Sequence, residues 1–223
     1  MKIKQIATKM INLIMDFIFP PNIEEKIIRE ISFDKFVEIA KTAEKTPYHF
    51  IKSSYSYIDA LIKEIVWQIK YMKNDKAIEL GSLAIYKYIK DNLRSNKILL
   101  IPIPISKQRR KERGYNQCEI LIDKVIEIYN KEYDPKITRQ FYIQKDFKIL
   151  RRKIHKDRQT LKSRKDRIVE SEGIFEAIPK EGFEDYKILI IDDVVTTGST
   201  ARSAYKEMKM AKYKNVEVLS LAR

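Results

Sequence analysis

Hydrophobic residues recur along the chain with two spacings, which separate expected helices from expected strands. Residues 57–72 carry aliphatic side chains three or four positions apart, which is typical of an amphipathic helix. Residues 97–105 and 187–192 are nearly continuous aliphatic runs, which are typical of buried strands. The expected helices cover 22–46, 57–72, 75–92, 116–130 and 199–212, and the expected strands cover 97–105, 138–144, 173–178, 187–192 and 215–222.

From about residue 55 onward the expected strands and helices alternate. Such alternation is typical of a parallel sheet with helices on both faces. We therefore predict an α/β domain over residues 55–223, with a mainly parallel sheet flanked by helices, preceded by an N-terminal helical segment over residues 1–54.

The N-terminal 22 residues also bear on localisation. Their apolar run is interrupted by Asn12 and Asp16, and no small-residue cleavage site follows. We interpret them as an amphipathic helix. No stretch approaches 18 consecutive apolar residues, so we expect no membrane span and a cytoplasmic protein.

Few residues of the chain are suited to disulfides or to soft metals. The single cysteine, Cys118, excludes an internal disulfide and a multi-cysteine zinc site. We expect it to be a small buried apolar residue. The only histidines, His49 and His155, argue against a histidine-rich metal site.

The positive charge is concentrated in two segments. Residues 107–113 hold five Lys/Arg and one Glu, and residues 145–167 hold eleven Lys/Arg and three Asp, out of a net charge of +14. Surface solvation alone would scatter these cations. Their concentration in two expected loops indicates binding of a polyanion: phosphate, pyrophosphate or nucleic acid.

The stretch ILIIDDVVTTGST, residues 188–200, places two carboxylates where an aliphatic strand ends and a helix begins. Ligands of open parallel sheets bind beyond the carboxyl ends of the strands. The first N–H groups of a helix lack partners and attract anions, and carboxylates accept hydrogen bonds from vicinal hydroxyls. The pattern predicts a sugar phosphate site, in particular for ribose 5-phosphate. The alternative is an ordinary strand–turn–helix in which Ser and Thr cap the helix.

The same stretch resembles the phosphoribosyl pyrophosphate motif of type I phosphoribosyltransferases: four aliphatic residues, two acids, an aliphatic, any residue, then T-T-G-x-T. The resemblance implies a phosphoribosyltransferase-like fold in which Asp192 and Asp193 hold the ribose hydroxyls. It implies that the 5-phosphate is bound by Thr196, Thr197, Gly198, Ser199 and Thr200.

Three motifs in order narrow the resemblance to the ComF family, phosphoribosyltransferase-like proteins linked to DNA uptake in natural competence. The segments IPIPISKQRRKERGYNQ (101–117) and RQTLKSRKDRIVESEGIF (158–175) are similar to two family signatures, as is the final LSLAR. Glu170 stands where the family usually has Asn. FIFPPN (17–22) resembles the family's beginning, but the four-cysteine zinc module that usually follows is missing, so we expect no zinc.

The resemblance assigns the basic segments to the pyrophosphate. We expect Lys107, Arg109, Arg110 and Arg113 to contact it, and residues 145–167 to form a basic loop that closes over the site. The first choices in that loop are Arg158, Gln159, Arg164 and Arg167. Mg²⁺ is expected through the pyrophosphate and ribose hydroxyls of the bound donor. The alternative for any one of these cations is a solvated helix face.

Two functions remain open. In the first, the protein is an enzyme that transfers phosphoribosyl to an unknown acceptor, with Asp192, Asp193 and Arg113 as catalytic residues. In the second, it is a non-catalytic protein that handles single-stranded DNA together with a competence helicase or senses nucleotides. Its stacking groove would comprise Tyr115, Phe141, Tyr142 and Phe147. Trp67 and Tyr71 are expected to be packing residues.

Overall fold

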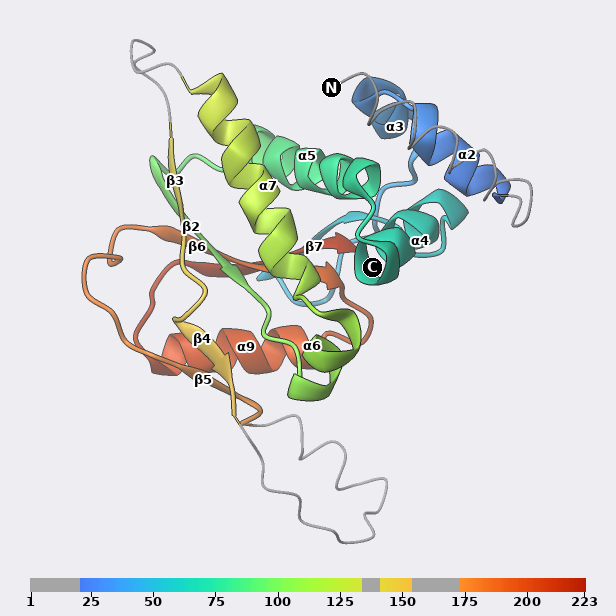
Figure 1. Ribbon diagram of the computed structural model, residues 1–223. Helices are drawn as coiled ribbons and strands as arrows, with labels where there is room; N and C mark the ends of the chain where they lie inside the picture. Colours follow the sequence, from blue (N-terminus) through green and yellow to red (C-terminus); the bar gives the residue numbers. More distant parts are fainter. Residues whose placement is uncertain (1–20, 134–140, 154–172) are drawn as a thin grey trace, which may run out of the picture.

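The computed structural model describes residues 21–133, 141–153 and 173–223, which are built around one five-stranded sheet (Figure 1). The strand order is β1-β7-β6-β2-β3, and every neighbouring pair is parallel. The strands are β1 (Ile51–Tyr55), β2 (Lys97–Pro102), β3 (Tyr142–Lys145), β6 (Lys187–Val194) and β7 (Val216–Ala222).

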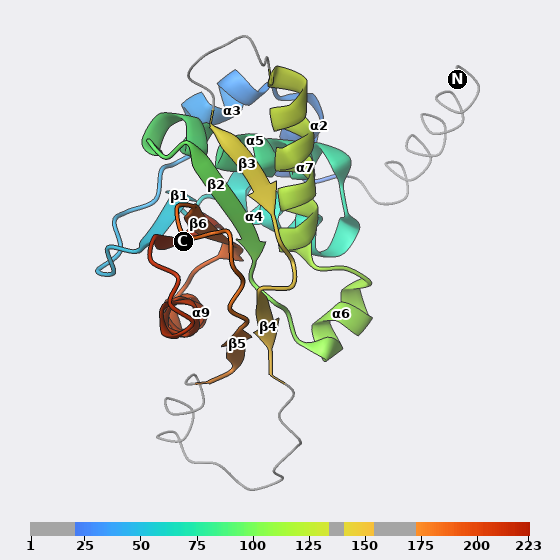
Figure 2. The ribbon, with the colours of Figure 1, turned by 90° about the vertical axis from the view of Figure 1, so that its left-hand side faces the viewer.

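Helices cover both faces of this sheet, and the alternation of side chains along each strand fills two cores. In β6, Leu189 and Ile191 enter the core beneath α5 and α7, whereas Ile188 and Ile190 enter the core against α9 (Figure 2). The helices are α2 (Ile23–Glu30), α3 (Phe33–Ile39), α4 (Ala60–Trp67), α5 (Asp75–Asn92), α6 (Lys107–Arg113), α7 (Gln117–Glu132) and α9 (Ser199–Met210), and η1 (Gln68–Met72) is a π-helix.

A two-stranded antiparallel ribbon stands apart from the main sheet. It pairs β4 (Leu150–Arg152) with β5 (Phe175–Ala177), and β5 packs against α9 (Figure 1). The expected strand at 173–178 therefore exists but does not join the parallel sheet. Otherwise the predicted fold class, an α/β fold with a mainly parallel sheet flanked by helices, is confirmed.

Three local expectations differ from the structure. Residues 107–113 are a helix, α6, rather than a loop: the Ser106 side chain caps its start, and Gly114, with φ of 80°, ends it. The expected helix over 22–46 is two short helices, α2 and α3. Strand β1 was not predicted, because only Ile51 and Tyr55 of its five residues are buried. Since β1 pairs with β7, the sheet begins a few residues before the expected domain boundary at residue 55.

Some predictions lie outside the described residues. These are the N-terminal helix within 1–20, the first part of the strand at 138–144, and most of the basic segment 145–167. Within the described part of the chain, no helix has the length and apolar character needed to span a membrane.

Candidate functional site

The two carboxylates near the carboxyl end of β6 are both buried, at 7% exposure for Asp192 and 5% for Asp193. Asp193 is fully supported. Its Oδ2 accepts hydrogen bonds from Lys70 Nζ at 2.9 Å and from Gln117 Nε2 at 3.1 Å, and its Oδ1 accepts one from the Val194 N–H at 2.8 Å. A cation and two neutral donors thus stabilise this buried charge.

Asp192 has much weaker support. Its Oδ1 accepts a hydrogen bond from the N–H of Asp193 at 2.9 Å, and no ion pair to it is found among the described residues. Burial, and next the charge of Asp193, raise the pKa of Asp192 well above its ordinary value. Hydroxyl donors or a cation reaching this carboxylate would relieve that cost.

The start of α9, directly after β6, lacks a side-chain cap. Gly198 occupies the N-cap position with φ of 76°. Among the described residues, the one side chain that bonds to the first N–H groups there is the Thr197 hydroxyl, 3.4 Å from the Ser199 nitrogen. Every other α-helix of the described residues has a side-chain cap, from Asn22, Ser32, Asp59, Asn74, Ser106 or Asn116. Among the described α-helices, α9 is therefore the one whose N-terminal N–H donors remain available to an anion.

The residues predicted to bind the phosphate all lie in this hydroxyl loop, residues 196–200. Thr196 and Thr197 are exposed, Ser199 and Thr200 are partly exposed, and Gly198 is buried. A Cβ added at Gly198 would lie 3.3 Å from Ile51, so the loop is packed closely onto β1. The loop combines solvent-accessible hydroxyls, of which that of Thr197 donates to Ser199 Oγ at 3.2 Å, with a closely packed backbone.

Arg202, in the first turn of α9, is a cation near this loop that sequence reasoning missed. Its guanidinium lies 4.9 Å from the centre of the Tyr48 ring and donates to the Tyr48 hydroxyl at 2.9 Å. A Cβ added at Gly198 would also lie 3.7 Å from the Tyr48 ring. The two residues are 154 positions apart, so no local pattern connects them.

Unlike Lys107 and Arg110 of the same helix, which line the cleft, Arg113 is linked to the carboxylates. Its Nη1 donates to Gln117 Oε1 at 2.8 Å, and Gln117 in turn donates to Asp193. Asn116 caps α7 and donates to the Ile103 carbonyl at 2.9 Å, which fixes the start of that helix. Arg113, Asn116 and Gln117 therefore position Asp193 through α7.

Lys70 is the second cation that sequence reasoning left unassigned. It belongs to η1, and the π-helical turn places its Nζ on Asp193 while the next residue, Tyr71, stays outside. Trp67 and Tyr71 are 49% and 59% exposed, so the expectation that they are packing residues is wrong. The aliphatic face of residues 58–69 predicted the helix but gave no signal for the charge pairing across 123 positions.

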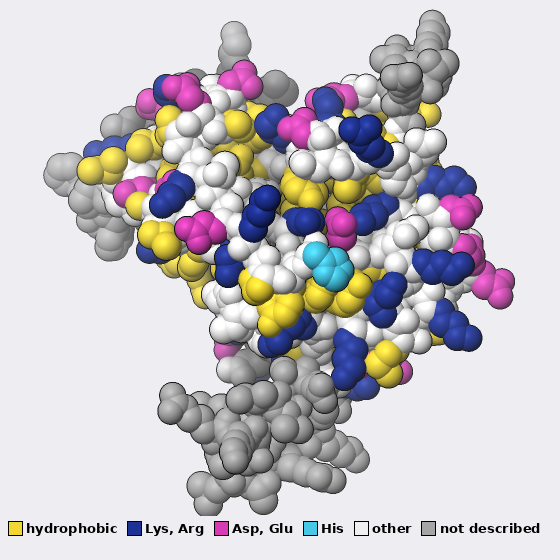
Figure 3. All heavy atoms as spheres, turned by 180° about the vertical axis from the view of Figure 1, so that it is seen from behind, with side chains coloured by type: hydrophobic (Ala, Val, Ile, Leu, Met, Phe, Trp, Pro, Cys, Tyr) yellow, Lys and Arg dark blue, Asp and Glu magenta, His cyan; other side chains and the backbone are white. Residues whose placement is uncertain are grey.

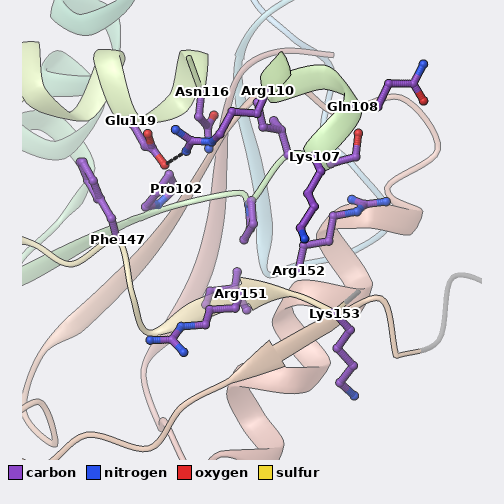
Figure 4. Close-up of a pocket in the computed structure, with 14 residues that line it drawn as sticks. Pro102, Lys107, Gln108, Arg110, Asn116, Glu119, Phe147, Arg151, Arg152 and Lys153 are labelled. Carbon is purple, nitrogen blue, oxygen red and sulfur yellow. Dashed lines mark hydrogen bonds and ion pairs between the residues drawn. The ribbon is translucent and has the colours of Figure 1, made fainter. Parts of the chain in front are cut away.

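A cleft of about 580 Å³ lies between α6, the start of α7 and β4 (Figure 4). Lys107 from α6 and Arg152 from β4 extend toward one another across it. Arg152 is exposed overall, but partial desolvation, and next the positive charge of Arg109, lower the pKa of its guanidinium. The described lining comprises Pro102, Pro104, Ile105, Ser106, Lys107, Gln108, Arg110, Asn116, Glu119, Phe147, Leu150, Arg151, Arg152 and Lys153.

The charges of this basic cleft are poorly balanced. Arg110 pairs with Glu119, but no carboxylate among the described residues pairs with Lys107 or Arg152 in the lining, or with Arg109, whose charge acts on Arg152 from outside the lining. On the opposite side of the molecule, Lys and Arg side chains are interspersed with Asp and Glu (Figure 3). Unbalanced cations that repel one another are typical of a site that awaits an anion.

Several expected contacts are not brought together in the described structure. Of the four aromatic residues expected to form a stacking groove, only Phe147 lines the cleft, and Phe141 instead stacks on Tyr129 at 6.1 Å.

Cys118 is fully buried, as expected, and burial raises the pKa of its thiol. Arg158, Gln159, Arg164 and Arg167 lie outside the described residues.

A metal at this site would depend on ligands from the substrate. Among the described residues, no group of three or more His, Cys, Asp or Glu could hold a metal ion. Two buried carboxylates beside an uncapped helix start nevertheless fit Mg²⁺, which keeps several waters and binds through few carboxylates together with substrate phosphates.

Comparison with known proteins identifies two relatives. Competence protein F of Haemophilus influenzae is 26% identical over 200 residues, which cover 87% of this chain and 75% of that protein. Competence protein ComFC of Bacillus subtilis is 26% identical over 153 residues, which cover 69% of this chain and 55% of that protein. The chain thus spans just over half of the length of ComFC.

Solved structures give a more distant likeness. A hypoxanthine phosphoribosyltransferase of Trypanosoma cruzi matches with a TM-score of 0.34 and 16% identity over 72% of this chain and 64% of that one. This likeness is too low to carry an argument. No family model matches the chain. The two competence proteins nevertheless support the resemblance to the ComF family that the three motifs predict.

Proposed function

We propose that the site binds phosphoribosyl pyrophosphate, with Mg²⁺ bound to the pyrophosphate. The observation that carries the proposal is the uncapped start of α9 immediately after two buried carboxylates. Free N–H donors at a helix start attract a phosphate, and the neighbouring carboxylates accept hydrogen bonds from sugar hydroxyls. A ribose 5-phosphate group presents both chemistries within one small molecule.

The parts of the donor are assigned to different elements. The 5-phosphate binds the hydroxyl loop, residues 196–200, and the ribose hydroxyls donate to Asp192 and Asp193. Lys70 and Gln117 hold Asp193 in place during binding. The pyrophosphate lies toward the basic cleft, where Lys107, Arg109 and Arg152 have no carboxylate partner among the described residues. Mg²⁺, when bound, would neutralise part of the pyrophosphate charge.

The chemistry that this arrangement supports is transfer of the phosphoribosyl group. A nucleophile's electron pair would form the new bond at C1 while the C1–O bond breaks, with inversion, and the bonding pair would leave with pyrophosphate. The cations of the basic cleft would stabilise the charge that develops on the leaving group. Asp192 and the hydroxyl loop would hold the ribose still while C1 moves between its two partners.

A second candidate function is the handling of single-stranded DNA. The unpaired cations of the basic cleft favour it, because phosphate contacts dominate affinity for nucleic acid, and Phe147 in the cleft could stack on a base. Both relatives are named as competence proteins. We therefore propose that the protein acts in DNA uptake, either through the donor site or beside it.

Calorimetric titration with ribose 5-phosphate, then with phosphoribosyl pyrophosphate with and without Mg²⁺, tests the first proposal. We expect Mg²⁺-dependent binding of the donor that is lost in Asp192→Ala/Asp193→Ala. The matched control is Asp91→Ala, which removes an exposed carboxylate paired with Lys87. Absence of binding by either ligand to the unaltered protein would show the proposal to be wrong.

A short oligonucleotide tests the second candidate. Binding should weaken steeply between low and physiological salt, and charge reversal at Arg151 and Arg152 should reduce both the affinity and its salt dependence. Affinity that ignores salt and these substitutions would exclude the basic cleft as a DNA site.

A further inference from the structure

Three large apolar side chains lie on the surface within one short segment of the chain. Trp67 is 49% exposed, Tyr71 59% and Met72 61%. Tyr71 and Met72 belong to η1 and Trp67 directly precedes it, whereas Gln68 and Ile69 of the same element are buried. Contiguous exposed apolar surface on a soluble domain commonly marks a binding site.

The backbone that presents these side chains is unusual. Residues 68–72 form a π-helical turn, and Lys73 ends it in the left-handed conformation at φ of 49°. Single π-helical turns are rare and frequently lie at functional sites, and a left-handed residue other than glycine is uncommon. The turn directs Lys70 to Asp193 and leaves Tyr71 on the outside.

The surface has the chemistry of a stacking site. The ring centres of Trp67 and Tyr71 are 5.9 Å apart and the ring planes are tilted by 45°, so a planar ligand can lie flat on one ring while the other ring borders it. The Arg113 guanidinium lies 5.2 Å from the centre of the Tyr71 ring. Lys73 lies 5.7 Å from the ring of Tyr115, whose hydroxyl is tied to the Ile69 carbonyl at 2.8 Å. Aromatic rings bordered by cations bind planar, electron-rich ring systems.

Two chains of contacts connect this surface with the carboxylates. Lys70, next to Tyr71 in the chain, pairs with Asp193, and Arg113 contacts both Tyr71 and Gln117, the second side-chain donor to Asp193. A ligand on the rings would therefore lie beside the place where we propose that the ribose binds. The border of cations does not suit a purely apolar helix of a partner protein.

We propose that Trp67 and Tyr71 form an aromatic platform on which a free planar nucleobase stacks as the acceptor. This inference rests on the proposed function, and it specifies what that function left open, the chemical class of the acceptor. Arg113 has two tasks in this arrangement: it borders the platform and orients Gln117 toward Asp193.

Trp67 is the only tryptophan of the chain and therefore reports on the platform directly. Adenine, hypoxanthine and uracil are titrated into the full chain, with and without ribose 5-phosphate, and the fluorescence is followed after correction for absorption. We expect saturable quenching by at least one base. Tyr71→Ala should weaken its binding about tenfold or more, as loss of one stacking partner does.

The matched control is Tyr133→Ala. Tyr133 is 46% exposed and lies 5.5 Å from the buried Tyr129, at the far end of α7, so it is an exposed aromatic residue with an aromatic neighbour away from the site. Binding should be unchanged in this variant. Trp67→Phe keeps an aromatic ring without the reporter, and calorimetry should detect nearly unaltered binding.

Failure of this inference can be separated from failure of the proposed function. If ribose 5-phosphate binds and no base quenches Trp67, or if Tyr71→Ala binds the base as tightly as the unaltered protein, the platform is not an acceptor site. Quenching by a thymidine oligonucleotide alone would also overturn the inference, in favour of nucleic acid. If bases bind and ribose 5-phosphate does not, the proposed donor is wrong while the platform stands as a base site.

Discussion

The carboxylates at the end of β6 and the cations of the basic cleft are held by the fold in opposite ways. Asp193 is buried and has three hydrogen-bond donors, one of them a cation. Lys107 and Arg152 are exposed and have no carboxylate partner among the described residues. Burial makes an unsupported charge costly, so the chain must supply partners inside, whereas exposed cations are tolerated until an anion arrives. One region is organised before binding, and the other is completed by the ligand.

The largest expected effect comes from removing the support of the buried region. Lys70→Met leaves Asp193 with only neutral donors, and breaking a buried ion pair in this way costs about 3 kcal/mol. We expect a decrease of this size in the free energy of unfolding at pH 7, measured by urea denaturation. Ribose 5-phosphate binding should weaken as well, because the carboxylate loses its fixed position.

The control for this prediction is Lys87→Met. Lys87 pairs with Asp91 at 2.7 Å, but both side chains are about half exposed, and surface pairs of this kind contribute about 0.5 kcal/mol or less. Equal decreases in the free energy of unfolding of the two variants would show that burial does not make the Lys70–Asp193 pair more important than an exposed pair.

The second prediction concerns the basic cleft. Lys107→Glu/Arg152→Glu should weaken binding of pyrophosphate by about 10- to 100-fold, because two charge-assisted contacts become repulsive. Affinity for ribose 5-phosphate and thermal stability should change little. Lys111→Glu, on α6 but outside the cleft lining, is the matched control. Isothermal titration with each ligand measures both affinities. A comparable loss of ribose 5-phosphate affinity would show that the basic cleft and the carboxylate region do not bind the two ligands independently.

The third prediction uses the weakly supported Asp192. Asp192→Asn should raise the melting temperature of the ligand-free protein by about 2–4 °C at neutral pH, near 1 kcal/mol, while it abolishes donor binding. The folded-state pKa of Asp192 is raised above the unfolded value, so the folded state holds the proton more tightly. Its contribution to stability is therefore present at pH below about 4 and is lost as the pH rises toward the folded-state pKa.

The pH dependence distinguishes this explanation from a general effect of the substitution. Differential scanning calorimetry between pH 4 and pH 8 should show the variant's advantage growing with pH. An advantage that is constant over this range, or that shrinks as the pH rises, would show that ionisation of Asp192 is not its cause.

Sequence reasoning was most successful where the information is local. The helix over 75–92 matches α5 to the residue, because an aliphatic period and capping residues lie within the same segment. The loop 196–200 at the start of α9 follows equally from adjacent residues. The partners of Asp193 could not be predicted, since Lys70 and Gln117 lie 123 and 76 positions away. Such contacts depend on strand order and helix packing, which no spacing along the chain encodes.

Arg113 also shows that contacts cannot be predicted from local sequence alone. Its position among four other cations in residues 107–113 predicted a pyrophosphate contact. The helical geometry of α6 instead takes its side chain to Gln117 and Tyr71. A basic cluster in sequence is thus divided by a helix between two sites, because residues six positions apart project in different directions.

The smallest expected effect separates an ion pair that supports a buried charge from one that only borders the basic cleft. Arg110 pairs with Glu119, and the Arg110 side chain is about half exposed, so Arg110→Gln should change the free energy of unfolding by about 0.5 kcal/mol or less. The substitution releases Glu119 as an unpaired carboxylate in the cleft lining, and pyrophosphate affinity should fall by about two- to fivefold through repulsion. The double variant Arg110→Gln/Glu119→Gln should restore most of that affinity, as measured by the same titration. If the double variant binds as weakly as the single one, Arg110 itself contacts the anion. The anion site would then include a cation that already has a carboxylate partner, Glu119, in the ligand-free protein.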